Sequence, residues 1–389
     1  MQQRDNSKEP GKAWIAAWCF AVIMASVTVT TPLWQYYEQR YGFGPTGVSA
    51  AFGAMTVGVF IALPLLGGLS DAWGRFRVMN IAIVIDLIAT ATLLIPGFAP
   101  LLLARVLQGC AVALTVSSAP PAIGEALSHD GESHPALTAS ISTVANLGGL
   151  GLGSLLAAIV VSTVGNPFVA PLLAFAVLLC VTLILCARLG IRDGNRLSFH
   201  VRLPKVPDGN LRAYLGAGLC GLASFAAFSV YASLGPGILH DTFSIHSALA
   251  GPILYCSVMA CSAVGQLILM RLKLTYRRIT GIALFVAGFA LVFTALSGHI
   301  LVVFIIGSLL LGLGSGLVLA EGSRIVTAHS HRETAAASQA GFFMMGYVGM
   351  VLPIIALAAL IGAVGITAAF AITGAALSLL VAVGIVATV

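Results

Sequence analysis

The sequence predicts an all-α membrane protein in which twelve transmembrane helices form two pseudo-symmetric bundles of six. Three observations predict this fold class. Hydrophobic residues make up 59% of the 389 residues and charged residues only 8%, whereas charged residues are about a quarter of a typical soluble protein. The apolar residues fall in long runs, each near the roughly 20 residues that a spanning helix needs. One polar segment in the middle of the chain separates two equal groups of runs.

The apolar runs supply six candidate spans in each half of the chain. The first group covers approximately residues 13–36, 47–70, 77–96, 99–127, 136–162 and 168–189. The second group covers approximately residues 212–236, 247–270, 279–298, 300–327, 334–360 and 363–388. Glycine is frequent, with 43 residues, as expected where membrane helices pack through small residues.

The polar segment at residues 190–211 is the only long break between spans. It carries basic residues, aspartates and two prolines, which the interior of a bilayer does not accept. We therefore divide the chain into a cytoplasmic amino-terminal segment (1–12), a first bundle (13–189), a cytoplasmic linker (190–211) and a second bundle (212–389). The first apolar run lacks a small-residue cleavage site, so we expect a retained helix and not a signal peptide.

The distribution of Lys and Arg predicts the orientation of the chain. Cytoplasmic loops of membrane proteins retain positive charge. With the amino terminus in the cytoplasm, all the basic residues except Arg40 and Arg105 fall at or near cytoplasmic segments. We expect a multi-pass protein of an inner or plasma membrane with both termini cytoplasmic. The net charge of +6 reflects this topology and does not indicate a nucleic-acid partner.

A short charged turn at residues 67–77 lies between the second and third candidate spans. Glycines let the chain turn there, while Asp71 and Arg75 place opposite charges at a membrane edge, where they can latch one conformation. The alternative without a gating role is a solvated turn whose basic residues only reflect the positive-inside bias of membrane proteins. The pattern Gly-x-Leu-x-Asp-x-x-Gly-Arg-x-Arg resembles the signature loop of the major facilitator superfamily, whose fold consists of two six-helix halves.

That resemblance implies a gate at the cytoplasmic side of the first half. In the family the loop aspartate meets the amino end of the eleventh helix, here near residues 333–336, where the helix dipole favours an anion. Glu125 resembles, by position, the fourth-helix acid that joins the Asp–Arg pair. The second half keeps basic residues after Gly265 but lacks the aspartate, which indicates asymmetric latching. The expected gating residues are Gly68, Asp71, Gly74, Arg75 and Glu125.

The fourth span contains Arg105-x-x-Gln108-Gly109, which resembles an element of proton-coupled drug exporters in this superfamily. An arginine inside a span is costly in lipid, so it must face protein or water, or else reach for the outer interface. The resemblance implies that Arg105 takes part in proton coupling.

Carboxylates inside the membrane are the natural proton carriers, and the candidates are Asp86, Glu321 and Glu38. Each has an alternative or a limit. Glu321 can form an intrahelical ion pair with Arg324 three residues later. Asp86 can make a structural hydrogen bond, because the third helix of the resembled fold is peripheral. Glu38 lies near the outer end of the first span.

The resemblance also implies a substrate cavity between the halves, lined mainly by the first, fourth, seventh and tenth helices. Aromatic and methionine side chains adapt to varied apolar ligands, although such residues also face lipid. The expected substrate-binding residues are Thr31, Trp34, Tyr37, Gln108, Ser118, Phe228, Tyr231, Gln339 and Phe343.

Several functional classes are not supported by the sequence. No Gly-x-x-x-x-Gly-Lys-Ser/Thr loop is present, so the chain is not an ATP-driven pump by itself. No nucleophile–base constellation indicates an enzyme. The pairs His129/His134 and His329/His331 lack a supporting cluster of acids or cysteines, and we expect no metal and no cofactor. The seven cysteines lack metal-type spacing and are expected to be free thiols.

The leading hypothesis is proton-coupled export of small amphipathic compounds by alternating access. Its partners would be a small-molecule substrate, protons and the lipid bilayer, and the resembled fold implies a monomer. In the fifth span, Ser154 stands where the exporters carry a proline. This departure keeps open a proton symporter or uniporter that imports a sugar or organic acid. A non-transporting membrane receptor is the third reading.

Overall fold

The computed structural model describes residues 9–128, 134–190, 203, 205–207, 210–331 and 334–388, and every regular element in them is a helix. The first half contains α1 (Glu9–Val27), η2 (Thr31–Leu33), α2 (Trp34–Tyr41), α3 (Gly44–Leu66), α4 (Leu69–Trp73), α5 (Arg75–Leu93), α6 (Phe98–Leu127), α7 (Pro135–Val164) and α8 (Ala170–Gly190). The second contains α9 (Leu211–Ser233), α10 (Gly235–Asp241), α11 (Ala250–Leu267), η3 (Leu269–Arg271), α12 (Leu274–Gly298), α13 (Leu301–His329), α14 (Ala335–Val364) and α15 (Ile366–Ala387). Most of the expected linker and the first eight residues lie outside the described ranges.

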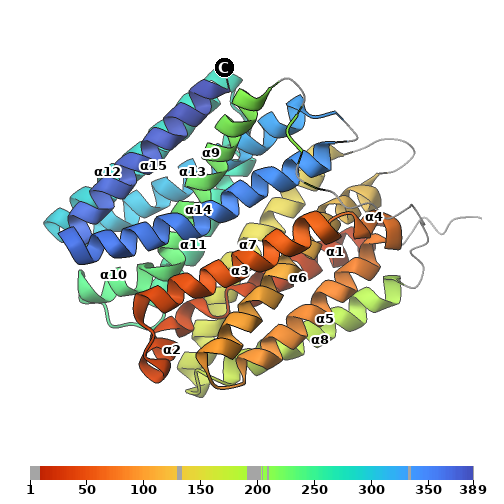
Figure 1. The fold of residues 1–389 in the computed structure, drawn as a ribbon, viewed down its shortest axis with the longest axis horizontal. Helices are drawn as coiled ribbons and strands as arrows, with labels where there is room; N and C mark the ends of the chain where they lie inside the picture. Colours follow the sequence, from red (N-terminus) through yellow and green to blue (C-terminus); the bar gives the residue numbers. More distant parts are fainter. Residues whose placement is uncertain are drawn as a thin grey trace, which may run out of the picture.

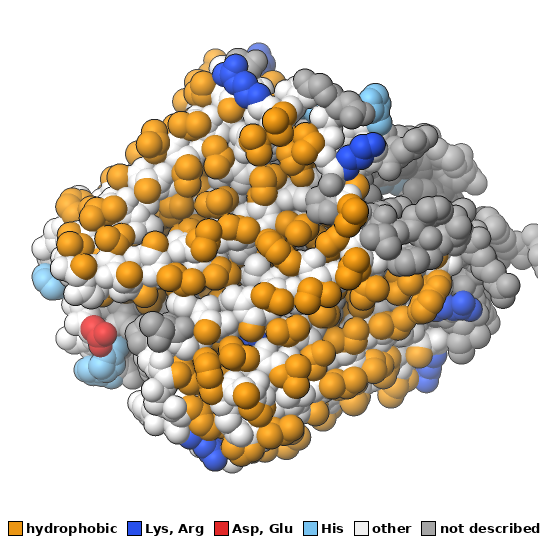
Figure 2. All heavy atoms as spheres, viewed as in Figure 1, with side chains coloured by type: hydrophobic (Ala, Val, Ile, Leu, Met, Phe, Trp, Pro, Cys, Tyr) orange, Lys and Arg blue, Asp and Glu red, His pale blue; other side chains and the backbone are white. Residues whose placement is uncertain are grey.

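Twelve helical spans in the described chain are long and apolar enough to cross a membrane, which confirms the predicted class. Figure 1 shows the first half, coloured red to lime, beside the second half, coloured green to blue. On the face seen in Figure 2, apolar side chains cover the middle of the molecule, and most of the charged and histidine side chains lie toward its edges. A bilayer explains this surface, because lipid solvates apolar side chains that water would not.

The two halves repeat the same helix pairings, as a pseudo-symmetric protein requires. In the first half α6 packs against α1, α3 and α5, while α1 packs against α7 and α5 against α8. In the second half α13 packs against α9, α11 and α12, while α9 packs against α14 and α12 against α15. Two further pairs, α7 with α11 and α3 with α14, join the halves in equivalent ways.

The first span of each half is broken near the same end of the molecule. The predicted span 13–36 runs as α-helix only to Val27, and the chain then turns through η2, which contains Pro32, into α2. In the second half α9 ends at Ser233 and α10 starts beside Pro236. Proline lacks the N–H that would continue an α-helix. We call this end, with α2 and α10, the far end, and the opposite end, with α4 and η3, the linker end.

The turn predicted at residues 67–77 is shorter than expected, because α4 occupies Leu69–Trp73 within it. The second span ends at Leu66 and the third begins at Arg75. Gly74 connects α4 to α5 with φ of 99°, a conformation that non-glycine residues rarely adopt. Gly68 has φ of −80°, which any residue can adopt, so of these two glycines only Gly74 is required by its backbone conformation.

Helices α3 and α6 approach closely through two glycines. A Cβ atom at Gly109 would collide with the backbone carbonyl oxygen of Met55, and one at Gly58 would collide with that of Val106. Small residues allow such close backbone packing between membrane helices. The contact holds the helix that carries Arg105 against its neighbour.

We expect Gly109→Ala to destabilise the protein by about 1–3 kcal/mol, the usual cost of overpacking. Thermal unfolding of the purified protein in detergent measures the effect. The control is Gly148→Ala in α7, where an added Cβ has no heavy atom within 4 Å. Equal unfolding temperatures for the two variants would contradict the close contact.

Candidate functional site

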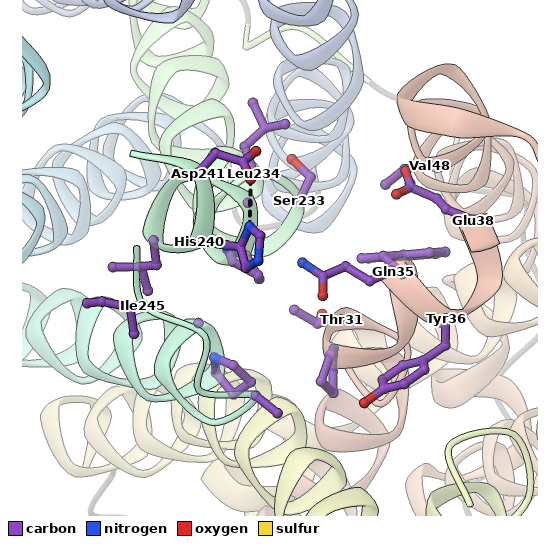
Figure 3. A pocket seen from close by; sticks show the side chains of 18 of the residues that line it. Thr31, Gln35, Tyr36, Glu38, Val48, Ser233, Leu234, His240, Asp241 and Ile245 are labelled. Atoms are coloured by element: carbon purple, nitrogen blue, oxygen red, sulfur yellow. Dashed lines mark hydrogen bonds and ion pairs between the residues drawn. The ribbon is translucent and has the colours of Figure 1, made fainter. Parts of the chain in front are cut away.

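A cavity of about 520 Å³ lies between the two halves at the far end. Figure 3 shows Thr31, Gln35 and Glu38 on one side and His240 and Asp241 on the other. The His240 Nδ1 and Asp241 Oδ1 atoms are 2.7 Å apart. None of the described residues that line this far-end cavity is Lys or Arg.

A second, smaller cavity of about 80 Å³ lies deeper between the halves, and we call it the central cavity. Its wall is mostly apolar, and Arg105 is the only Lys, Arg, Asp or Glu among the described residues that line it. Thr31 lines both cavities, so the two spaces adjoin. The aromatic residues of its wall are Phe52, Phe225, Phe228, Tyr255, Phe343 and Tyr347.

Arg105 is only 2% exposed, and α6 places it in the wall of the central cavity. Its Nη1 atom donates to the Val27 carbonyl oxygen at 2.8 Å, to Gln108 Oε1 at 2.7 Å and to Thr30 Oγ1 at 3.4 Å. Its Nη2 atom lies 3.1 Å from the Met55 sulfur. Its Nε atom is buried and has no hydrogen-bond acceptor in the described part of the chain.

Two aromatic rings also border the Arg105 guanidinium. Its carbon lies 5.8 Å from the centroid of Trp34 and 5.7 Å from that of Phe52. A cation within about 6 Å of a ring face is attracted by the quadrupole of the ring. Arg105 thus points into protein and does not extend to an interface, so snorkelling is not needed to explain it.

Asp86 on α5 is fully buried within the first half. Neither of its carboxylate oxygens has a hydrogen-bond partner among the described residues, and the Ser26 hydroxyl is also buried without one. The Ser26 hydroxyl nevertheless lies close enough to this carboxylate to act as a donor, although not at full hydrogen-bond geometry, and Arg105 interacts with the carboxylate through its charge. The structure therefore brings a buried acid and a buried base, Asp86 and Arg105, into one bundle.

At the linker end the expected gating charges meet. Arg75 contacts the Asp71 carboxylate, and its Nη2 atom lies 2.9 Å from Glu125 Oε1. It also donates to Ser70 Oγ at 2.8 Å. Glu125 remains largely exposed, with 61% of its side-chain surface accessible. The helix whose amino end was expected to meet Asp71 is α14, which begins at Ala335. Glu333, in the expected contact region, lies outside the described residues.

The equivalent place in the second half holds a larger ionic cluster. Glu321 on α13 is 1% exposed and lies 2.7 Å from Arg324, as its i,i+3 spacing indicates. It also lies 2.8 Å from Arg277 and 3.2 Å from Arg278. The last two contacts join α12 to α13, as Arg75 and Glu125 join α5 to α6. We call these four residues the arginine cluster.

The halves also touch across their interface on the linker-end side of the central cavity. Thr143 on α7 donates a hydrogen bond of 3.2 Å to the side-chain oxygen of Gln266 on α11. Farther along these helices, Gly151 packs against Cys256. Of the far-end and central cavities, the larger is thus at the far end, while side chains of the two halves meet toward the linker end.

The residues expected to bind substrate divide into two groups. Trp34 lines the far-end cavity, Phe228 and Phe343 line the central cavity, and Thr31 lines both. The others line neither cavity, and these are Tyr37, Gln108, Ser118, Tyr231 and Gln339.

Local partners account for three of that second group. Gln108 accepts from Arg105, Ser118 donates to the Leu114 carbonyl oxygen at 2.6 Å, and Gln339 donates to Ser323 at 2.6 Å. Their roles toward a substrate remain predictions.

Sequence reasoning missed several residues of the two cavities. Phe52 and Met55 on α3 and Tyr255 on α11 line the central cavity. They lie on the second and eighth spans, which contribute to the cavity in the resembled fold. An aromatic or methionine residue on those spans could therefore have been predicted to line the cavity. His240 and His246 gave no local signal of their place in the far-end cavity.

Comparison with known proteins identifies the fold. Residues 16–207 match the family model of the Major Facilitator Superfamily. The uncharacterized MFS-type transporter YybF of Bacillus subtilis (strain 168) is 30% identical over 95 residues, which span 24% of this chain and 24% of that protein.

Among solved structures, the human organic anion transporter MFSD10 superposes with a TM-score of 0.71 at 16% identity, over 98% of this chain and 100% of that one. A bacterial homolog of the human lysosomal transporter Spinster, solved in an inward-facing and unoccupied conformation, superposes with a TM-score of 0.71 at 14% identity. The superposition covers 98% of this chain and 97% of that one. The nucleoside transporter NupG, solved as a mutant, superposes with a TM-score of 0.69 at 15% identity, over 97% of this chain and 99% of that one. At such low identities these structures establish the shared fold and nothing about the substrate.

We expect Glu321→Gln to lower stability by about 3 kcal/mol or more, because removing one partner of a buried ion pair leaves uncompensated charge. Here three arginines lose their shared carboxylate. The matched substitution Glu125→Gln breaks an exposed pair and should cost about 1 kcal/mol or less. Unfolding of both purified variants in detergent tests the difference, and similar losses would show that the arginine cluster does not hold α12 to α13.

Proposed function

Because this chain belongs to the major facilitator superfamily, we propose that it is a proton-coupled secondary transporter. It would move small amphipathic compounds across an inner or plasma membrane by alternating access. The observation that carries the proposal is the burial of Asp86 and Arg105 in one bundle, with Arg105 in the wall of the central cavity.

Alternating access is supported by the arrangement of the cavities. Both lie between the halves, so a rocking motion of one half against the other would change their access. The positive charge at the linker end supports a cytoplasmic location for that end. In this orientation the described conformation has its larger cavity on the outer side.

Asp86 is the proposed proton carrier. Its carboxylate is buried, with the Ser26 hydroxyl nearby but no hydrogen bond of full geometry. A buried charge is costly without such hydrogen bonds, and taking up a proton removes that charge. Glu321 is a weaker candidate because a proton on it would break its contacts with three arginines. Glu38 lines the far-end cavity, where it would take part in proton entry from the outer side.

Two modes of coupling follow from different observations. The element Arg105-x-x-Gln108-Gly109 supports export by proton antiport, because it resembles that of proton-coupled exporters. The absence of a carboxylate among the described residues of the central cavity supports the second mode, import of an organic acid by proton symport. A cationic cargo would find no counter-charge in that cavity, whereas an organic acid would find Arg105.

Proteoliposomes with an imposed pH gradient test the transport function. A panel of amphipathic dyes and organic acids should contain compounds whose flux responds to the gradient. Asp86→Asn should abolish that response, because an amide cannot carry the proton, while flux down a substrate gradient persists. Glu9→Gln, at the first residue of α1, is the matched acid-to-amide control.

Flux that ignores the pH gradient in the unaltered protein would contradict proton coupling. A gradient response that survives Asp86→Asn would exclude Asp86 as the carrier. The direction of gradient-driven flux separates export from import.

A further inference from the structure

One edge of the Arg105 guanidinium lacks an oxygen partner. The Nη1 atom makes all three of the hydrogen bonds to oxygen. The Nε atom has no acceptor among the described residues, and the Nη2 atom has only the thioether sulfur of Met55. A thioether is a weak acceptor.

The Nε and Nη2 atoms form the side of a guanidinium that binds a carboxylate through two parallel hydrogen bonds. This geometry distinguishes arginine from lysine, which offers a single ammonium group. An unpaired buried donor is costly. The Arg105 side chain is only 2% exposed, so water does not solvate its unpaired Nε donor. This donor therefore indicates that an acceptor is missing.

The two residues at this edge, Arg105 and Met55, belong to the wall of the central cavity. Aromatic and aliphatic side chains form most of the rest. Methionine is flexible enough to move aside for a ligand. The cavity thus combines one cationic fork with an apolar enclosure.

Other ionisable groups near the fork do not compete for it. Asp86 interacts with Arg105 through its charge, but neither of its carboxylate oxygens accepts a hydrogen bond of full geometry from it. The remaining titratable side chains that interact with Asp86 or Arg105 are thiols and phenols, which are neutral near pH 7. They are Cys19 on α1, Tyr37 on α2 and Tyr255 on α11.

We propose that the central cavity binds an amphipathic monoanion whose carboxylate pairs with the Nε and Nη2 atoms of Arg105. The carboxylate displaces the Met55 sulfur, and the apolar body of the ligand packs among Phe225, Phe228 and Phe343. This inference rests on the proposed transport function, and it selects organic acids as the cargo.

The anion site is linked to Asp86. When Asp86 is ionised it partly neutralises Arg105, and when it takes a proton the Arg105 charge is left for the ligand. Proton and anion therefore strengthen each other's binding, since coupling between two sites is reciprocal. Cooperative binding of both in one conformation is the requirement for symport.

Three probes of similar shape and different charge test the site, namely phenylacetate, phenethylamine and phenethyl alcohol. Binding of radiolabelled phenylacetate to the full chain in nanodiscs is measured by equilibrium dialysis, with the other two compounds as competitors. We expect phenylacetate to bind and neither competitor to displace it at equal concentration. Its affinity should rise as the pH falls from about 8 to about 6, where the probe stays ionised.

Substitutions at the fork give further outcomes. Arg105→Lys should weaken phenylacetate binding by at least about tenfold, the worth of a charge-assisted hydrogen bond. Met55→Leu should strengthen it about threefold, because the ligand no longer displaces a weak hydrogen bond. Asp86→Asn should make the affinity independent of pH. Arg212→Lys, at an exposed position on α9, is the matched control and should have no effect.

The proposal is overturned if phenylacetate does not bind, if phenethylamine or phenethyl alcohol displaces it equally well, or if Arg105→Lys leaves its affinity unchanged. Should Arg105→Lys fail to fold, Met55→Leu decides, and an unchanged or lower affinity overturns the proposal. A pH dependence that persists in Asp86→Asn overturns the link between proton and anion.

Flux is scored separately so that the two hypotheses fail in different ways. Gradient-driven flux of phenethylamine without phenylacetate binding would overturn the anion site and support the transport function. Phenylacetate binding without flux of any compound in proteoliposomes would support the site and overturn the transport function.

Discussion

The structure depends on how each ionised group inside the helical bundles is compensated. A charge in the bilayer interior is costly unless partners or water surround it, and Arg105, Asp86 and Glu321 differ in this respect. Arg105 has oxygen acceptors on one edge only, Asp86 has the Ser26 hydroxyl nearby but no hydrogen bond of full geometry among the described residues, and Glu321 contacts three arginines. The first two groups are free to exchange partners, whereas the third is fully engaged.

This difference separates the roles of the two halves despite their matching helix pairings. In the first half, Arg105 lines the central cavity and has an unsatisfied Nε atom, and an exposed Glu125 completes the charge contacts at the linker end. In the second half, a fully buried carboxylate ties α12 to α13. The proposed proton carrier and the charged part of the proposed anion site thus belong to the first half, whereas the arginine cluster ties two helices of the second half together.

Local patterns predicted the residues near the linker end better than those of the cavities. Asp71 and Arg75 are four residues apart, and their contact follows from that spacing. The contacts of Glu321 with Arg277 and Arg278 join residues more than forty positions apart, and the sequence showed only the basic pair and the nearby Arg324. Gln108 was expected to meet substrate, but it accepts a hydrogen bond from Arg105 instead of lining either cavity.

The sequence by itself determined the twelve spans, their division into two halves and the asymmetry of basic charge. Hydropathy and charge are properties of short segments, and the bilayer acts on each segment separately. Only the tertiary structure decided which buried groups have partners, which edge of Arg105 is free and which side chains line the cavities. Those features depend on how each helix is rotated against neighbours distant in the chain, and close packing through Gly58 and Gly109 settles that rotation for α3 and α6.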